Sequence, residues 1–338
     1  MSRGISIILP VFNEQDWIGR SLKYLDEAVA ESDFKTECIV VDDGSNDESA
    51  SIAEGFKTST DRLKIRVIRQ KNKGRYLARK TGVEEAKFES ILFIDSRVFI
   101  NKKALKFLQS RLQKNGDFQV WNAHVNVAKK GNVFARFWDA IVLVAWRRYF
   151  ANPRETSYGL AEFDYFPKGT TCFFVPTKLF KEALADFEKH NKAEKFSNDD
   201  TVLIRYIAGK TPIHIAPQFS CTYNARATFK KFLKHAYHRG QVFVDGFLKP
   251  GNRFFYPLIA FLLLCVGLVF SIIIWPFVMV KLLLAGVILM IVGLFFGGLI
   301  FKLDWRDSLT LAALSPFFAV VYGAGIWRAA LRKWGVWA

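Results

Sequence analysis

Four short apolar runs stand out in the first hundred residues, each bounded by polar or small residues. They are rich in isoleucine and valine, which is typical of strands buried on both faces of a sheet. The runs cover residues 5–11, 37–41, 64–68 and 90–94. Between them, apolar positions recur at helical spacing over residues 14–30, 47–57 and 74–87. Strands that alternate with helices predict an α/β fold with a mostly parallel sheet, wound by right-handed crossovers.

The last third of the chain has a different pattern, because most of it is uniformly apolar. Residues 256–301 contain a single charged residue, Lys281, and about 20 apolar residues suffice to cross a bilayer. The run predicts two membrane-spanning helices, at 257–276 and 282–301. A third candidate span, Ser308–Trp327, follows a short polar link. We therefore expect two or three transmembrane helices.

The formal net charge is +17, with 48 Lys and Arg against 31 Asp and Glu. Such a charge suits a protein that lies against anionic membrane lipids and binds phosphate groups. Nucleic acid would also attract it, but the apolar spans and the lack of a recognisable nucleic-acid-binding motif argue against that partner. The four cysteines show no CxxC spacing, so neither a disulfide framework nor a zinc site is expected.

Polar and acidic residues follow three of the predicted strands directly. Asn13 and Glu14 come after the first strand, Asp42 and Asp43 after the second, and Asp95 after the fourth. In sheets of this kind, ligands bind beyond the carboxyl ends of the strands. Like charges gathered there are costly unless a cation or hydrogen-bond donors use them. The pattern therefore predicts a ligand site at this edge of the sheet.

The stretch IVVDDGSNDES, residues 39–49, also allows a purely structural interpretation. Gly44 would turn the chain, and Ser45 with Glu48 has the spacing of a capping box for the next helix. This interpretation leaves Asp42 without a role.

The order and spacing of four motifs resemble a family 2 glycosyltransferase with the GT-A fold. The motifs are ILPVFNEQDWIGRSL, IVVDDGSNDES, RQKNKGRYLARKTGVEEA and ILFIDS, in a dense match over residues 4–100. A looser likeness over residues 160–208 includes FPKGTTCFFVPTKLFKEA and NDDTVLIRYIA. With the apolar pattern, the resemblance predicts a GT-A domain over 1–225, a basic interface region over 226–255 and a transmembrane region over 256–338.

By this resemblance the donor is a nucleotide sugar, most often a uridine diphosphate sugar. The residues that would line the nucleotide site are Pro10, Val11, Asn13 and Glu14. Asp43 would accept a hydrogen bond from the base, a task that suits a carboxylate because it only accepts, and Asp42 would orient the loop. For Glu14 the alternative is an ordinary acid in the first turn of a helix, favoured by the helix dipole.

Basic residues surround Gly74, which opens the third predicted helix. A helix N-terminus with nearby cations is an anion site, and in the family this segment faces the donor. Lys73, Gly74 and Arg79 are the candidates here. A solvated basic face is the alternative.

After the fourth strand the chain departs from the family pattern. Family members usually carry Asp-X-Asp there, which helps to hold a divalent metal on the diphosphate, whereas this chain has Asp95, Ser96 and Arg97. All three are candidates for contact with the nucleotide sugar, but arginine cannot be a ligand of Mn²⁺ or Mg²⁺. Either Asp95 and water hold the metal with Arg97 turned away, or Arg97 pairs with the diphosphate through its planar fork. We expect a metal, Mn²⁺ or Mg²⁺, at Asp95.

The acidic pair Asp199 and Asp200 resembles the family's pair, in which the second acid is the catalytic base. A sugar hydroxyl must lose its proton as it attacks, so a positioned base favours a hydroxyl acceptor. An isoprenoid phosphate is already anionic and needs no base. The structural alternative is a cap, since Ser197 and Asp200 have capping-box spacing.

Residues 226–241 place aromatic and aliphatic side chains on one helical side and lysines elsewhere. That pattern is typical of a helix lying in the membrane interface. His238 and Arg239 are predicted to end the helix, on the acceptor or lipid side. The Gln-X-X-Arg-Trp signature of processive polysaccharide synthases is absent from the sequence.

The sequence thus predicts an inverting glycosyltransferase that spans the plasma (inner) membrane several times. The catalytic domain is expected in the cytoplasm, because no signal peptide or apolar span is recognised before residue 255. The enzyme would move a sugar to a hydroxyl of a lipid-linked or membrane-proximal glycan acceptor, with Asp200 as base. A polyprenyl-phosphate glycosyltransferase and a non-catalytic nucleotide-sugar-binding membrane protein are the alternatives. No oligomeric state is indicated.

Overall fold

The computed structural model describes residues 4–114, 120–190, 199–225, 228–248 and 254–335. The chain divides into two compact units. The first unit consists of Met1–Ala128 and Trp146–Ala225, and the second of Lys129–Ala145 and Arg226–Ala338.

A large mixed sheet runs through the first unit. Its strands are β1 (Gly4–Val11), β2 (Lys35–Asp42), β3 (Leu63–Arg69), β4 (Ser90–Ile94), β6 (Val120–Asn122), β8 (Thr156–Tyr158), β9 (Cys172–Pro176) and β10 (Ile213–Ile215). Among the described residues their order is β3-β2-β1-β4-β9-β6-β10-β8. Strands β1 to β4 pair in parallel, and β9 lies antiparallel between β4 and β6. The carboxyl ends of β1, β2 and β4 therefore lie side by side.

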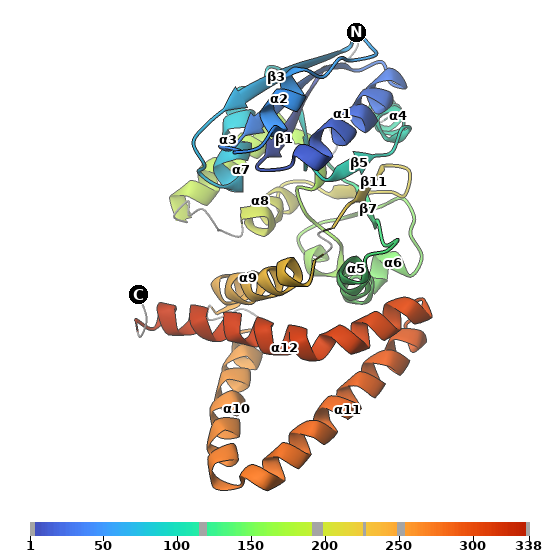
Figure 1. The fold of residues 1–338 in the computed structure, drawn as a ribbon. Coiled ribbons are helices and arrows are strands. Elements are labelled where there is room, and N and C mark those ends of the chain that lie inside the picture. Colours follow the sequence, from blue (N-terminus) through green and yellow to red (C-terminus); the bar gives the residue numbers. More distant parts are fainter. Residues whose placement is uncertain (1–3, 115–119, 191–198, 226–227, 249–253, 336–338) are drawn as a thin grey trace. The chain divides into compact units, whose positions relative to one another are not determined.

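Helices cover both faces of the sheet (Figure 1). On one face are α1 (Gln15–Ala30) and α4 (Ala104–Lys114), and on the other α3 (Arg75–Glu84), α7 (Thr177–His190) and α8 (Asp199–Ala208). Successive residues of a strand point to opposite faces, so Ile7 and Leu9 pack with α1 while Ile8 packs with α3.

Shorter elements complete the first unit. They are helices α2 (Ser49–Glu54) and α6 (Arg147–Phe150), the 3₁₀ turn η1 (Phe163–Tyr165), and a small sheet of β5 (Val98–Ile100), β11 (Ser220–Tyr223) and β7 (His124–Val127). The predicted α/β fold is confirmed, with each of the four predicted strands found within two residues of its predicted ends.

The predicted capping box is wrong. Helix α2 begins at Ser49, and Glu48 at its N-cap makes no capping hydrogen bond through its side chain. The hydroxyl of Ser45 instead accepts a hydrogen bond from the backbone N–H of Asn13, 32 residues earlier. Ser45 thus links two loops at the edge of the sheet and does not cap a helix. The other proposed cap, Ser197 with Asp200, lies outside the described residues because it includes Ser197.

The second unit is helical and consists, in its described part, of α5 (Val133–Ala145), α9 (Phe229–Phe247), α10 (Phe255–Ile274), α11 (Pro276–Ile300) and α12 (Trp305–Lys333). Three of these, α10, α11 and α12, are long and apolar enough to cross a membrane. Only 11% of the apolar stretch of α10 and 6% of that of α11 is buried. Apolar side chains so widely exposed suit contact with lipid, so the unit associates with a membrane.

The predicted end of the basic helix at His238 and Arg239 is wrong, since α9 continues to Phe247. Gly240, the next residue, lies inside the helix and allows close packing. A Cβ at this position would lie 2.1 Å from the carbonyl oxygen of Tyr322 in α12. Only a glycine lets the two backbones approach to this distance.

Candidate active site

The loops that follow β1 and β2 are tied together at the edge of the sheet. Asn13, in the left-handed region at φ 54°, accepts a hydrogen bond at its Oδ1 from the N–H of Asn46 over 2.8 Å. The N–H of Glu14 donates to the hydroxyl of Ser49 over 2.8 Å. Asparagine tolerates the left-handed conformation better than most residues. These contacts place Asn13 and Glu14 in one rigid edge with the loop after β2.

The other two residues predicted to line the nucleotide site lie at the end of β1. Pro10 is partly buried, and the side chain of Val11 is buried in the core that packs on α1. The carbonyl oxygen of Val11 accepts a hydrogen bond from the N–H of Asp43 over 2.9 Å. At Val11 it is therefore the backbone, not the side chain, that meets the acidic loop.

The carboxylate of Asp43 is buried and holds the loop before α3. It accepts hydrogen bonds from Gln70 Nε2 at 2.7 Å and from the backbone N–H groups of Lys73 and Gly74, both at 2.8 Å. A carboxylate has about four acceptor positions, so one remains after these three contacts. Gly74 has φ 95°, a conformation that favours glycine. The neighbouring Asp42 accepts from the N–H of Ser45 over 3.2 Å and so shapes its own loop.

Arg79 bridges the end of β4 and the start of α8. Its side chain is only 2% exposed, and its guanidinium lies 2.5 Å from Asp200 and 3.5 Å from Asp95. The side chain of Asp95 is 22% exposed and that of Asp200 is 28% exposed. The cation is thus buried while both carboxylates keep access to solvent. Asp199 opens α8, but its side chain lies outside the described part of the structure.

The electrostatics around Asp95 favour a bound positive charge. Burial raises the pKa of its carboxyl above the ordinary value, and the nearby charge of Asp200 adds to this rise, although Arg79 and Arg75 oppose it. Another cation placed beside both carboxylates would stabilise their ionised forms.

Arg97 forms an ion pair with Glu14. Its Nε lies 2.7 Å from Glu14 Oε2 and 2.9 Å from Oε1, and the two side chains are 13% and 8% exposed. The guanidinium also stands 5.1 Å from the ring centroid of Trp17. Ser96, beside it, is buried. Arg97 is thus balanced by a carboxylate of the protein, a pairing that sequence reasoning missed because the partners are 83 residues apart.

No group of three or more His, Cys, Asp or Glu residues able to hold a metal lies within the part of the chain that the structure describes. The ligands present still fit a hard divalent ion if the substrate supplies the other oxygen atoms. Asp95 offers carboxylate oxygen, and Mg²⁺ commonly takes one or two carboxylates together with substrate phosphates. The site suits a metal held jointly with a diphosphate.

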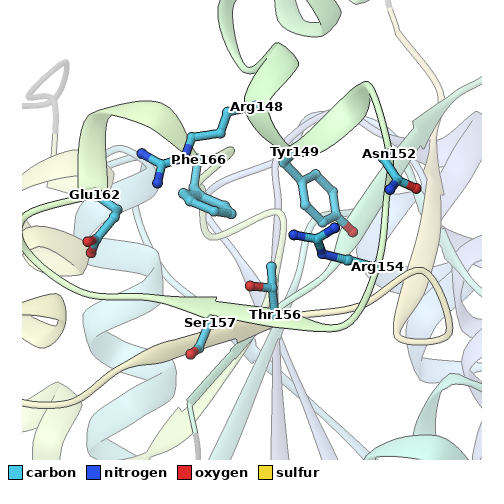
Figure 2. Close-up of a pocket in the computed structure, with 8 residues that line it drawn as sticks. All are labelled: Arg148, Tyr149, Asn152, Arg154, Thr156, Ser157, Glu162 and Phe166. Carbon is cyan, nitrogen blue, oxygen red and sulfur yellow. The ribbon is translucent and has the colours of Figure 1, made fainter.

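A separate cavity of about 280 Å³ is lined by residues from α6 to the end of η1 (Figure 2). Its lining consists of Arg148, Tyr149, Asn152, Arg154, Thr156, Ser157, Glu162 and Phe166. The hydroxyl of Tyr149 lies 3.0 Å from Nδ1 of His124. Neither Arg148 nor Arg154 forms an ion pair with any described residue. Two guanidinium groups against the single carboxylate of Glu162, beside hydroxyl and amide side chains, make a cavity suited to an anion.

His238 and Arg239 belong to α9 in the second unit. The Nε of Arg239 lies 3.4 Å from Nε2 of His235, and its guanidinium 5.9 Å from the ring centroid of Trp138. The role predicted for His238 and Arg239, contact with the acceptor or lipid, stays a prediction.

Comparison with known proteins identifies the chain's relatives. The family model described as Glycosyl transferase family 2 matches residues 6–182. Glycosyltransferase GlyG of Streptococcus pneumoniae serotype 4 is 29% identical over 136 residues, 40% of this chain and 44% of the relative. The undecaprenyl-phosphate 4-deoxy-4-formamido-L-arabinose transferase of Pseudomonas fluorescens is 30% identical over 92 residues, 27% of each chain. The matches thus span less than half the length of these curated relatives.

A solved structure has the same fold. The crystal structure of S. aureus TarS 1–349 in complex with UDP-GlcNAc matches with a TM-score of 0.50 and 18% sequence identity, over 72% of this chain and 67% of TarS.

Proposed function

The chain belongs to glycosyl transferase family 2, and from this premise we propose that it transfers a sugar from a UDP-sugar to a hydroxyl of a lipid-linked or membrane-proximal glycan. It is a glycosyltransferase with the GT-A fold. The observation that best supports the proposal is the Arg79 bridge, which holds Asp95 and Asp200 together with both carboxylates partly exposed.

The proposed reaction is a direct displacement. The acceptor hydroxyl gives its proton to the carboxylate of Asp200, and its oxygen forms a bond to the anomeric carbon of the donor. The bond from that carbon to the phosphate oxygen breaks, and the nucleoside diphosphate leaves with the electron pair. Attack from the side opposite the leaving group inverts the anomeric centre. Arg79 holds Asp200 in place through the hydrogen bond between its guanidinium and the carboxylate.

The donor would be held by residues at the ends of β1, β2 and β4. The remaining acceptor position of Asp43 suits an N–H of a uracil base. Lys73 and Gly74, at the start of α3, would face the diphosphate. A divalent metal, Mn²⁺ or Mg²⁺, would be held by Asp95 with the diphosphate and would stabilise its developing negative charge. The Glu14 partner of Arg97 supports the alternative in which Arg97 is turned away from the donor.

We expect Asp43→Ala to weaken the binding of free UDP by more than about 1 kcal/mol, the usual cost of a lost hydrogen-bond partner. Isothermal titration calorimetry measures the change, with circular dichroism to check the fold. Gln70→Ala is the matched control, because it removes one of the three hydrogen bonds of Asp43 without removing the acceptor proposed for the base. An unaltered UDP affinity in Asp43→Ala, or an equal loss in both variants, would contradict direct recognition of the base.

The cavity beside α6 supports an acceptor that carries a phosphate group. Most arginines of the first unit pair with acids, as Arg111 does with Glu155, whereas Arg148 and Arg154 face the cavity without such a partner. A phosphate of a lipid linker or of a phosphorylated glycan would pair with these two guanidinium groups. The same chemistry keeps open the polyprenyl-phosphate alternative, in which the phosphate itself is the nucleophile.

The double variant Arg148→Ala/Arg154→Ala is expected to raise KM for a phosphate-bearing acceptor about tenfold or more. A hydrogen bond to a charged group contributes roughly 1.5–3 kcal/mol. Steady-state transfer assays check this, with UDP affinity measured in parallel. Arg147→Ala is the matched control, since Arg147 is also exposed on α6 but does not line the cavity. Equal KM values in the double variant and the control would rule out the cavity as an acceptor site.

For the membrane, we propose that the first unit is cytosolic and that α10 and α11 cross the bilayer as a hairpin. No helix before Phe255 in the described residues is long and apolar enough to span. The polar link of Lys302, Asp304 and Arg306 after α11 would return to the cytosol, as the positive-inside rule requires.

A further inference from the structure

Helices α9 and α12 pack lengthwise against each other and run in the same direction within the second unit (Figure 1). Near the start of α9, the rings of Phe229 and Phe317 lie 5.8 Å apart. Beyond its end, Lys333 Nζ donates to the carbonyl oxygen of Leu248 over 2.7 Å. Between these points, Gly240 lets the backbones approach closely. The two helices therefore share one tilt in any membrane.

Helix α9 carries charges that bar it from the hydrocarbon core. Lys230, Lys231, Lys234 and Arg239 are all exposed. If α12 crossed the bilayer through its apolar stretch, Phe317 would lie close to the midplane. Its neighbour Phe229 would then bring Lys230 and Lys231 to the same depth, where charged side chains are costly.

Apart from Ala319, the exposed residues of α12 between Leu309 and Ala324 form a single apolar stripe. It consists of Leu309, Ala313, Phe317, Val320 and Ala324, spaced three or four residues apart, whereas Leu311, Ala312, Ser315 and Ile326 are buried. One-sided exposure of this kind is typical of a helix lying in the interface plane. Helices α10 and α11 differ, because their apolar side chains are exposed nearly all round.

The start of α12 is fixed by a buried ionic cluster. Asp307, which is 1% exposed, accepts hydrogen bonds from Lys129 at 2.8 Å and from Arg136 at 2.6 Å. Burial lowers the pKa of Lys129, but its bonds to Asp307 and Asp139 outweigh this effect and leave the pKa raised. The ammonium therefore stays charged and paired, and it ties α5 to the beginning of α12.

We infer that α9 and α12 lie together in the plane of the membrane interface, so that α12 does not cross and the α10–α11 hairpin is the crossing element of the described chain. The lysines of α9 face anionic lipid headgroups, and the apolar stripe of α12 faces the acyl chains. Arg328, Arg332 and Lys333 then stay on the same side as α9. A third span would carry them across, against the positive-inside rule.

Thiol labelling of the full-length protein in sealed membrane vesicles tests the topology. Single variants Trp275→Cys, Arg306→Cys and Trp334→Cys are treated with a membrane-impermeant maleimide before and after permeabilisation. We expect Trp334→Cys and Arg306→Cys to label from the same side and Trp275→Cys from the other. The unmodified protein is the background control, since three of its cysteines are buried and Cys265 lies within α10. Trp334→Cys labelling with Trp275→Cys, or all three on one side, would overturn the inference.

Spin-label depth provides a second measurement that does not depend on vesicle orientation or on activity. Nitroxides replace the exposed Leu309 and Val320 on α12, and Ile288 in the middle of α11. An in-plane helix gives Leu309 and Val320 similar shallow depths and leaves Ile288 near the bilayer centre. A spanning α12 would place Val320 far deeper than Leu309, and that result would overturn the proposal.

Discussion

Asp200→Asn is expected to lower sugar transfer by about 10²- to 10⁴-fold, the usual contribution of a positioned general base, while UDP binding is unchanged. Asparagine keeps an oxygen that can accept from the Arg79 guanidinium, which bonds Asp200 in the native protein. The substitution therefore removes the base without removing the bridge to α3. Initial rates of transfer to a hydroxyl acceptor measure the loss.

The matched control is Asp186→Asn, which makes the same chemical change at a half-exposed aspartate of α7 outside the site. It is expected to transfer at the native rate. If Asp200→Asn also transferred at the native rate, the hydroxyl acceptor would be excluded. An acceptor phosphate, already anionic, would then be the nucleophile, as in the polyprenyl-phosphate alternative.

The strands that carry the site could be predicted because their signal is local. Each is a short apolar run buried on both faces, and β4 was predicted with the bounds that the structure has, Ser90–Ile94. Parallel pairing then brings the carboxyl ends of β1, β2 and β4 together. The convergence of Asp43 and Asp95 on one edge follows from topology alone.

The contacts that organise the site could not be predicted in the same way. Asp43 meets Gln70, and Arg97 meets Glu14, across 27 and 83 residues of chain. No local pattern marks these pairs, since each residue alone resembles an ordinary surface polar group. The sequence left open whether Arg97 turns away or pairs with the diphosphate, and the structure gives it a carboxylate partner.

Gly240 and Ser45 show why local rules failed elsewhere. The apolar and basic pattern that stops near Arg239 indicated a helix end, and a serine three residues before a glutamate indicates a cap. In both places a distant element decides the outcome. The backbone of α12 occupies the place that a Cβ at residue 240 would take. The loop after β1 donates a backbone N–H to the hydroxyl of Ser45.

Removal of divalent metal is expected to abolish transfer, and added Mn²⁺ or Mg²⁺ to restore it. The leaving diphosphate gains negative charge in the transition state, and a divalent ion beside both phosphates stabilises it more than one guanidinium can. Asp95→Asn should have the same effect, because it removes the carboxylate proposed to hold the ion. Because the pKa of Asp95 is raised, protons should compete with the metal at a higher pH than for an ordinary aspartate.

Arg97→Ala separates the two interpretations of the altered motif. It leaves the Glu14 carboxylate buried without its partner, and breaking a buried ion pair costs about 3–5 kcal/mol of stability. We therefore expect a lower Tm but nearly native UDP-sugar affinity, measured well below the unfolding transition. In the double variant Glu14→Gln/Arg97→Gln, part of the lost stability should return because no charge is left unpaired. Full activity in excess chelator, together with weakened donor binding in Arg97→Ala, would show that Arg97 has taken the place of the metal.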